Sequence, residues 1–178
     1  MTPFFERLCP VMTIQLGATS AGDDRQPIGV FMTLHFTPAA IVAEARSWIG
    51  TPYRHQASVK HVGCDCLGLV RGVWRACLGT EPELPPPYAP DWAEARGEET
   101  LAAAAFRHLV GVPREGIGGG DVLLFRWRAG FVAKHVAIAT NDGTMIHAHD
   151  GAAVCEVALS PWWRWRLAYA FRFPGVTV

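Results

Sequence analysis

The sequence has no excess of charge of either sign and no long apolar run. Its 178 residues include 16 Lys and Arg against 16 Asp and Glu, so the formal net charge is zero. Without a basic excess there is no electrostatic footprint for nucleic acid or for an anionic membrane surface. No uninterrupted apolar stretch approaches the roughly 20 residues of a membrane-spanning helix. We therefore expect a globular protein whose partners include neither nucleic acid nor a membrane.

The chain also lacks the features of a secreted, disulfide-rich protein. The stretch MTPFFERLCPVMTIQLGATSAGDD has no basic start, and Glu6, Arg7 and Pro10 interrupt its apolar residues, so we expect no secretory signal peptide. Five cysteines are an odd number, which favours synthesis in a reducing compartment. Residues 1–36 show no sustained periodicity, and we expect them to form an arm, poorly ordered or bound to a partner, outside a domain that spans 37–178.

Helix signals fill the first half of that domain. The stretch TPAAIVAEARSWIG, residues 37–50, has a capping Thr, a Pro at the first helical position and a Gly stop. Its apolar face is predicted to run through Ile41, Ala45 and Ile49. A second helix is predicted over 66–78, followed by a Gly stop, and EETLAAAAFRHL is typical of a third.

Strand signals fill the second half. Five apolar stretches have strand character, namely DVLLFRW, FVAKHVAIAT, TMIHAHD, AAVCEVAL and LAYAFRF. They are separated by RAG, NDG, DG and SPWWRW, all of which are plausible turn material. Helices followed by a meander of short strands predict an α+β fold, in which N-terminal helices pack on a five- to six-stranded antiparallel sheet.

The stretch GCDCLGLV places two cysteines one residue apart where a loop becomes the second helix. A helix N-terminus supplies partial positive charge and free N–H groups, which favour a nucleophilic thiolate at Cys66 and a bound oxyanion beside it. Three other interpretations stay open. Cys66 could be a small core residue, or Cys64 and Cys66 could form a strained disulfide. Both could also bind zinc with His147 and His149, although these spacings are not the usual ones.

Two histidines lie on the strands that flank the turn NDG. If the turn is tight, His135 and His147 are symmetric about Asn141 and become cross-strand neighbours, with Cβ atoms about 5 Å apart. Three alanines share the His135 side of its strand and would let the helix that carries Cys66 approach closely. The result would be a nucleophile, a base imidazole and a second imidazole that fixes the orientation of the base.

Five motifs in order resemble the NlpC-type cysteine peptidases, papain-like enzymes that cleave the stem peptides of peptidoglycan. The motifs are GTPY at 50–53, DCLGLV at 65–70, GDVLLF at 120–125, HVAIAT at 135–140 and MIHA at 145–148. The resemblance covers residues 37 to about 173. It implies a papain-like fold and a thiolate and imidazole chemistry that needs no metal or cofactor.

The resemblance also implies a role for each residue at a motif position. Cys66 matches the nucleophile, His135 the general base and His147 the third, orienting residue. Tyr53 matches a tyrosine that could hydrogen-bond the oxyanion or the substrate. Asp65 matches an acidic residue that helps receive the amino end of the stem peptide.

Two departures from the family pattern bear on specificity and setting. Leu67 replaces the usual serine and removes a hydroxyl near the amino group of the substrate. The loop PYRHQASVKHVG lacks the common W-G-G form and is similar to the variant in cell-wall peptidases of tailed phages and gene transfer particles.

The resemblance thus implies a D-glutamyl endopeptidase made in the bacterial cytoplasm and carried by a tail hub or tail-tip protein to the wall in the periplasm. Two alternatives remain, which are an amidase or acyltransferase on the same scaffold and a catalytically silent tail-tip adaptor.

Overall fold

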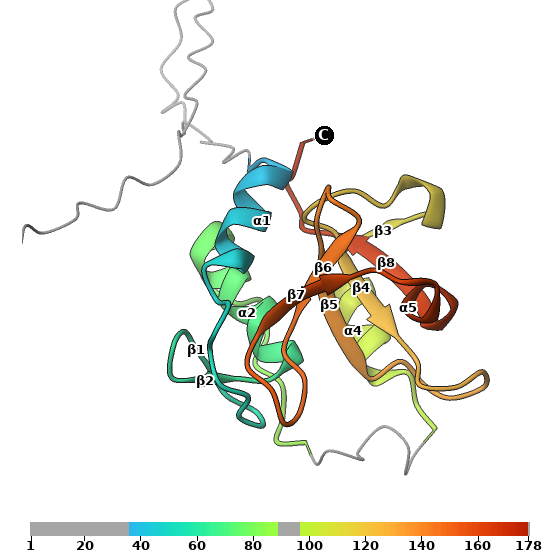
Figure 1. The fold of residues 1–178 in the computed structure, drawn as a ribbon, viewed down its shortest axis with the longest axis horizontal. Helices are drawn as coiled ribbons and strands as arrows, with labels where there is room; N and C mark the ends of the chain where they lie inside the picture. Colours follow the sequence, from blue (N-terminus) through green and yellow to red (C-terminus); the bar gives the residue numbers. More distant parts are fainter. Residues whose placement is uncertain (1–35, 89–96, 178) are drawn as a thin grey trace, which may run out of the picture.

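The computed structural model of the chain describes residues 36–88 and 97–177. The arm predicted over 1–36 therefore lies outside the described residues, apart from Phe36, and stays a prediction. In chain order the elements are α1 (Pro38–Arg46), β1 (Ser58–Val59), β2 (Gly63–Cys64), α2 (Cys66–Leu78), α4 (Thr100–His108), β3 (Val110–Val112), a 3-10 turn (Arg114–Gly116), β4 (Val122–Phe125), β5 (His135–Ala139), β6 (Thr144–His147), β7 (Cys155–Ala158), α5 (Pro161–Arg166) and β8 (Leu167–Arg172) (Figure 1).

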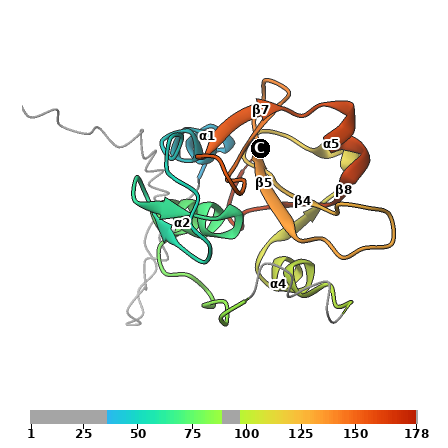
Figure 2. The same cartoon turned by 60° about the horizontal axis from the view of Figure 1, so that its bottom comes forward.

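Six strands form one antiparallel sheet in the order β3-β8-β4-β5-β6-β7, and β1 pairs with β2 in a small separate sheet. Helix α2 lies alongside β5, and α1 packs on α2 (Figures 1 and 2). The predicted α+β class, with N-terminal helices packed on an antiparallel sheet, is confirmed.

The apolar core is divided between the two faces of the sheet. One cluster joins α1, α2 and α4 to the strands, and Val136 and Ile138 of β5 belong to it. Ala137 and Ala139 belong to the second cluster, together with residues of the β7–β8 connection. The prediction that the alanine side of β5 faces the Cys66 helix is therefore wrong. The helix packs on the Val136 side, where larger side chains provide more apolar area to bury.

Helix α1 begins as predicted but ends sooner. The side chain of Thr37 caps the first turn, and the helix ends at Arg46. Turns then lead to Gly50, whose φ of 86° is the left-handed conformation that glycine adopts readily. Because the helix ends early, Ile49 is 42% exposed, and its predicted place on the apolar face is wrong. Trp48 is buried instead.

Helix α2 has the bounds predicted for it. The Asp65 side chain accepts a hydrogen bond from the Gly68 N–H at the start, and Gly79 follows the last turn with a φ of 91°. Gly72 lies against the Trp48 indole, where a Cβ atom would be 2.0 Å from the ring. The absence of a side chain at Gly72 therefore lets Trp48 pack directly on the helix backbone.

The β5–β6 hairpin has a register two residues away from the predicted one. Ile138 pairs with Ile146, so the connection is a three-residue loop at 141–143 whose last residue is a glycine with a φ of 71°. Asn-Asp-Gly fits such a loop because only the third position needs a left-handed backbone. His135 and His147 are therefore diagonal and not directly opposite. They still share one face, because residues two apart on a strand point the same way.

Two further elements differ from the prediction. The SPWWRW stretch, predicted as a turn, contains the helix α5, which begins with a Pro at its first position. The stretch Val110–Val112 forms β3, which pairs with β8 at the edge of the sheet. Among residues 36–88 and 97–177, no helix is both long and apolar enough to cross a bilayer.

Candidate active site

Cys66 is the first residue of α2 and is half-buried. The backbone N–H groups of Cys66, Leu67 and Val136 lower the pKa of the thiol by hydrogen bonding. Burial has the larger effect and, with the nearby Asp65 carboxylate, raises the pKa to about 11. The thiol is therefore protonated at neutral pH until a base takes its proton.

The Val136 N–H relates this thiol to the strand that carries His135. Val136 follows His135 in β5 and its backbone N–H lowers the pKa of the thiol, so the Cys66 end of α2 lies near the start of that strand. His135 is buried, with 6% of its surface exposed. Its Nε2 lies 2.9 Å from Nδ1 of His147, which is 4% exposed. The structure thus brings together Cys66, His135 and His147 at one end of the β5–β6 hairpin.

Burial keeps both imidazoles neutral. It is the main cause that lowers the pKa of His135 to about 3, with His147 and His149 adding to the effect. Burial and His149 lower the pKa of His147 to about 4. A lone thiolate and a lone imidazolium are both disfavoured in this site, but a proton passed from Cys66 to His135 leaves the net charge of the pair unchanged. Transfer of a proton within the pair would therefore cost less than forming either charge alone.

Aromatic rings enclose the base. The indoles of Trp127 and Trp163 stack on His135, with ring centroids 5.8 Å and 5.5 Å away and interplanar angles of 29° and 27°. His149, which is exposed, lies with its ring centroid 6.2 Å from that of His135. These contacts limit the orientations open to the His135 ring.

Asp65 is 2% exposed and lies at the centre of a network of neutral donors. Its Oδ1 accepts the Gly68 N–H at 2.7 Å, and its Oδ2 accepts the Gln56 N–H at 2.7 Å and the Tyr88 hydroxyl at 2.5 Å. The Tyr88 carbonyl in turn accepts a bond from the Gln56 side-chain amide, at 2.6 Å. An amino group from a substrate would have to compete with the Tyr88 hydroxyl to reach Asp65.

Tyr53 and Leu67 flank the same helix start. Tyr53 is half-buried, and its backbone bridges to Cys64. Burial, followed by the charges of Cys66 and Asp65, raises the pKa of Tyr53 to about 12, so its hydroxyl stays a hydrogen-bond donor. Leu67 packs against the first core cluster.

The alternative interpretations of the cysteine pair are not supported by the described residues. Cys64 and Cys66 are both free, so they form no disulfide. Cys64 is fully buried in the core. In the part of the chain that the structure describes, no three His, Cys, Asp or Glu side chains are arranged to hold a metal ion, so the predicted zinc set is not assembled.

The motifs do not identify several residues that complete the site. Tyr88 follows three prolines, and its position in sequence gives no sign that it reaches Asp65. Trp163 belongs to a stretch predicted as a turn. The alternation of His147 and His149 was a usable signal, since residues two apart on a strand share a face.

Comparison with known proteins gives a family and a set of relatives. The sequence model of the NlpC/P60 family matches residues 50–172. The Gamma-DL-glutamyl hydrolase of Bacillus subtilis is 30% identical over 139 residues, which are 78% of this chain and 30% of that protein. The Murein DD-endopeptidase MepS/Murein LD-carboxypeptidase of Escherichia coli K12 is 28% identical over 133 residues, which are 74% of this chain and 61% of that protein. The chain thus spans less than two thirds of these curated relatives.

Solved structures share the same fold. The NlpC/p60 domain of the peptidoglycan hydrolase SagA is 27% identical, with a TM-score of 0.52, and the match covers 78% of this chain and 100% of that one. An NlpC/P60 family protein from Bacillus cereus ATCC 10987 is 22% identical, with a TM-score of 0.58, and the match covers 78% of this chain and 41% of that one.

Proposed function

The chain belongs to the NlpC/P60 family and has its papain-like fold, and on this basis we propose that it is a cysteine peptidase that hydrolyses an amide bond in the stem peptide of bacterial peptidoglycan. The bond we propose is the one that follows D-glutamate. The observation that carries the proposal is the 2.9 Å contact between two buried imidazoles, His135 and His147, together with Cys66 at a helix N-terminus near Val136 of the same strand. The printed names of the relatives, a glutamyl hydrolase and a murein endopeptidase, support the substrate class.

Acylation begins when the substrate carbonyl lies against Cys66. The thiol proton moves to His135 as sulfur attacks the carbonyl carbon. For His135 to accept this proton on Nδ1, its Nε2 must carry hydrogen and donate to Nδ1 of His147. The amide C–N bond then breaks, and the leaving amine takes the proton from His135. The product is a thioester on Cys66 and a free amine.

Deacylation uses the same groups in reverse. A water molecule gives its proton to His135 and attacks the thioester carbonyl. The C–S bond breaks, the thiol of Cys66 regains the proton, and the acyl group leaves as a carboxylic acid. In both halves the carbonyl oxygen becomes negative, and the Tyr53 hydroxyl, still protonated because its pKa is raised to about 12, is a candidate donor to it.

The proposed setting is a phage-like tail or gene transfer particle, with a tail hub or tail-tip protein as the partner of residues 1–36. The support for this setting is the sequence of the loop after GTPY, which has no W-G-G. Synthesis in the cytoplasm, followed by delivery to the wall within a particle, is part of the same proposal. The setting can be tested by comparing binding of the full chain and of a 37–178 form to isolated particles. Equal binding of the two forms would remove the role of the arm.

The activity is tested by digestion of purified peptidoglycan in water enriched in ¹⁸O, with mass spectrometry of the fragments. We expect cleavage within the stem peptide and one ¹⁸O atom in the new carboxyl group. Transfer of the acyl group to an amine would instead give a new amide without ¹⁸O. If neither the native chain nor Cys66→Ala released fragments, the proposed hydrolysis would be rejected and a silent adaptor favoured, and equal release by both would exclude Cys66 as the nucleophile.

A further inference from the structure

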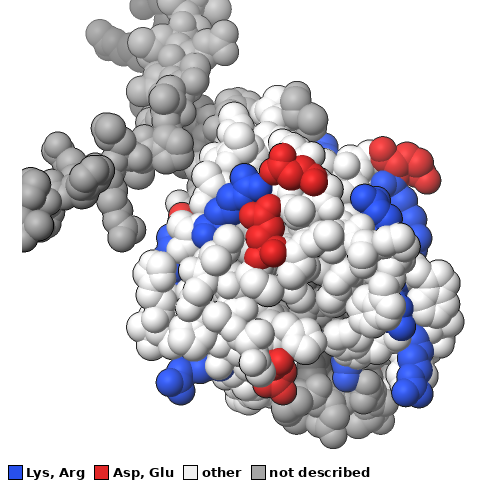
Figure 3. Space-filling view, in the orientation of Figure 1, with Lys and Arg blue, Asp and Glu red and all other residues white. Residues whose placement is uncertain are grey.

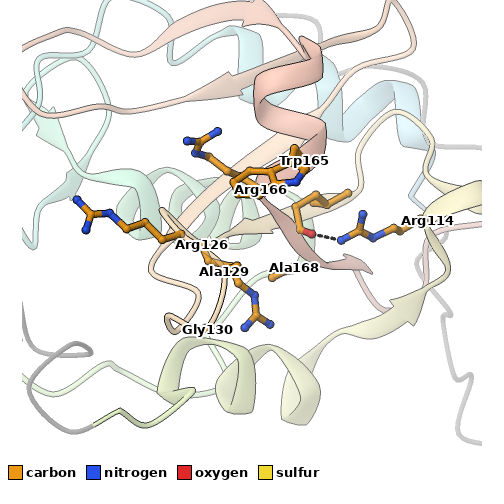
Figure 4. A pocket seen from close by; sticks show the side chains of 9 residues that line it. Arg114, Arg126, Ala129, Gly130, Trp165, Arg166 and Ala168 are labelled. Atoms are coloured by element: carbon orange, nitrogen blue, oxygen red, sulfur yellow. Dashed lines mark hydrogen bonds between the residues drawn. The ribbon is translucent and has the colours of Figure 1, made fainter.

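A pocket of about 340 Å³ lies beside α5 and the connection between β4 and β5, outside the group of residues assigned to catalysis. Four arginines line it, namely Arg114, Arg126, Arg128 and Arg166, together with Trp165, and none of its lining residues is acidic (Figure 4). The whole chain has no net charge. The four guanidinium groups therefore form a basic patch on a molecule without net charge. Figure 3 shows basic side chains, in blue, along the edge of the molecule where α5 lies.

Most of this positive charge is not neutralised by the described residues. Arg126 forms an ion pair with Glu99, with a distance of 3.1 Å. Arg114 donates to the carbonyl of Leu167, and Arg166 to two further backbone carbonyls, which orient these guanidinium groups without cancelling their charge. Arg128 is exposed, and its guanidinium lies 5.9 Å from the centroid of the Phe131 ring.

A series of contacts between side chains connects Arg166, which lines the pocket, to His135. The Arg166 guanidinium lies 3.6 Å from the centroid of the Trp162 ring. Trp162 contacts Trp163 at 4.7 Å, and Trp163 stacks on His135 at 5.5 Å. Trp162 is 47% exposed and Trp165 65% exposed. Exposed indoles next to arginines are typical of surfaces that bind a ligand, and these contacts join the pocket to the cluster of side chains that contains His135.

We propose that this pocket is a specificity site for carboxylate groups on the part of the substrate that lies beyond the scissile bond, so that the enzyme selects a carboxylate-rich peptide chain. Arginine suits this role because its planar guanidinium matches a carboxylate and keeps its charge. Figure 4 shows the side chains of Arg126 and Arg114 pointing in different directions around the pocket. Carboxylates spaced along a chain fit this arrangement better than one small anion. The inference rests on the proposed function and narrows its substrate class.

Two sources could supply such a chain, a peptidoglycan stem peptide or a γ-linked glutamate polymer. The test uses matched synthetic peptides of both kinds, each prepared with free carboxyl groups and with those groups amidated. The full chain, Arg128→Gln and Arg126→Gln are compared by kcat and KM. Arg107→Gln is the matched control, since Arg107 is a surface arginine paired with Glu83 and does not line the pocket.

We expect the native chain to prefer the carboxylate form over the amidated form, and Arg128→Gln to reduce that preference about three- to tenfold, mainly through KM. Arg107→Gln should keep the preference, and added salt should weaken it in the native chain. The peptide series with the stronger dependence on Arg128 identifies the source. Equal preference in the native chain and both pocket variants would overturn the inference while leaving the hydrolysis intact.

Binding separates this inference from the proposed hydrolysis. Cys66→Ala, which cannot turn over, is titrated with a fluorescent carboxylate peptide and its amidated counterpart. Binding that depends on both the carboxylates and Arg128, without turnover by the native chain, would contradict the proposed hydrolysis and support the proposed carboxylate site. Turnover without such binding would reject the pocket.

Discussion

Cys66 and Cys64 are two residues apart, and their surroundings give them different chemistry. Cys66 is half-buried at the start of α2, and its sulfur receives backbone N–H groups. Cys64 is fully buried in β2, and burial raises the pKa of its thiol to about 12. These surroundings agree with the proposal that the first thiol exchanges a proton with His135, whereas the second is part of the apolar core.

Substitution of each cysteine should therefore separate activity from stability. We expect Cys66→Ala to abolish hydrolysis and to leave the free energy of unfolding within about 1 kcal/mol of native. Cys64→Ala should keep most of the activity and lose about 1 kcal/mol of stability, because it leaves a small gap in the core. Fragment release and urea unfolding measure the two effects. Equal loss of activity in both variants would contradict the assignment of Cys66 alone as the nucleophile.

Substitution of His135 should lower the rate of hydrolysis more than substitution of His147. His135→Ala removes the base, which is typically worth about 10²–10⁴ in rate, so it should be nearly inactive. His147→Asn should retain measurable turnover, because holding the His135 ring needs an acceptor and not a charge. The rates of Cys66 alkylation against pH, measured in both variants, provide a second readout. If His147→Asn lowered turnover and changed the alkylation profile more than His135→Ala did, the roles of base and orienting residue would have to be exchanged between the two histidines.

At the residue level the sequence predicted the contact between two histidines better than their surroundings. The choice of Cys66, His135 and His147 as candidates follows from motifs, and the pairing of the two histidines survives a two-residue error in register because that error moves His147 along its strand without turning it away. The network around Asp65 could not be predicted. It depends on the path of a proline-rich loop that brings the Tyr88 hydroxyl back to the helix start, and such loops have no periodic pattern.

Among the helices and strands, the close contact between α1 and α2 sets the position of the nucleophile. Trp48 follows α1, is 3% exposed, and packs on the α2 backbone at Gly72. Its indole N–H also donates to Glu44, which fixes the ring. The start of α2, and hence Cys66, is therefore placed by a contact one and a half turns further along the helix.

Gly72→Ala should be destabilising although alanine is the better helix former. The gain in helix propensity is about 1 kcal/mol, but the new Cβ would lie 2.0 Å from the buried Trp48 ring. Overpacking typically costs about 1–3 kcal/mol, so we expect a net loss of up to about 2 kcal/mol in urea unfolding. Gly111→Ala in β3 is the control, since no atom lies within 4 Å of its added Cβ. Greater stability of Gly72→Ala would show that Trp48 moves aside without cost.

Elements with strong local signals were predictable, and those defined by distant contacts were not. The Thr37 cap, the Gly79 stop and the apolar strands all act within a few residues, and the structure confirms them. β3 has three residues and exists because β8 pairs with it. The exposure of Ile49 depends on the residue at which α1 ends, and the ends of helices are decided by packing as much as by local sequence.

For the whole molecule, buried titratable groups define a range of pH in which the fold is most stable. The folded-state pKa values of His135 and His147 are lowered from 6.5 to about 3 and about 4. Below pH 6.5 the unfolded chain therefore binds more protons than the folded one, so stability falls as pH falls. The thiols of Cys64 and Cys66 have pKa values raised from 9.0 to about 12 and about 11. Above pH 9 the unfolded chain loses protons that the folded chain keeps, so stability falls again.

We therefore expect the free energy of unfolding to be greatest between about pH 6.5 and 9. Each histidine contributes a slope of up to about 1.4 kcal/mol per pH unit below that range. Urea unfolding under reducing conditions from pH 4.5 to 10 measures the profile. His147→Asn should show a shallower acid limb and the same alkaline limb. An unchanged acid limb in that variant would mean that other groups cause the acid loss.

The stacking of Trp127 and Trp163 on His135 also gives the site an optical property. An imidazolium placed against an indole withdraws electron density from the excited ring and quenches its fluorescence. Emission from these two tryptophans should therefore stay constant across neutral pH, where His135 carries no charge, and should dim during the moments when His135 holds the proton from Cys66. The intrinsic tryptophan fluorescence of the protein would therefore decrease when His135 is protonated, and this decrease can be measured without an added dye.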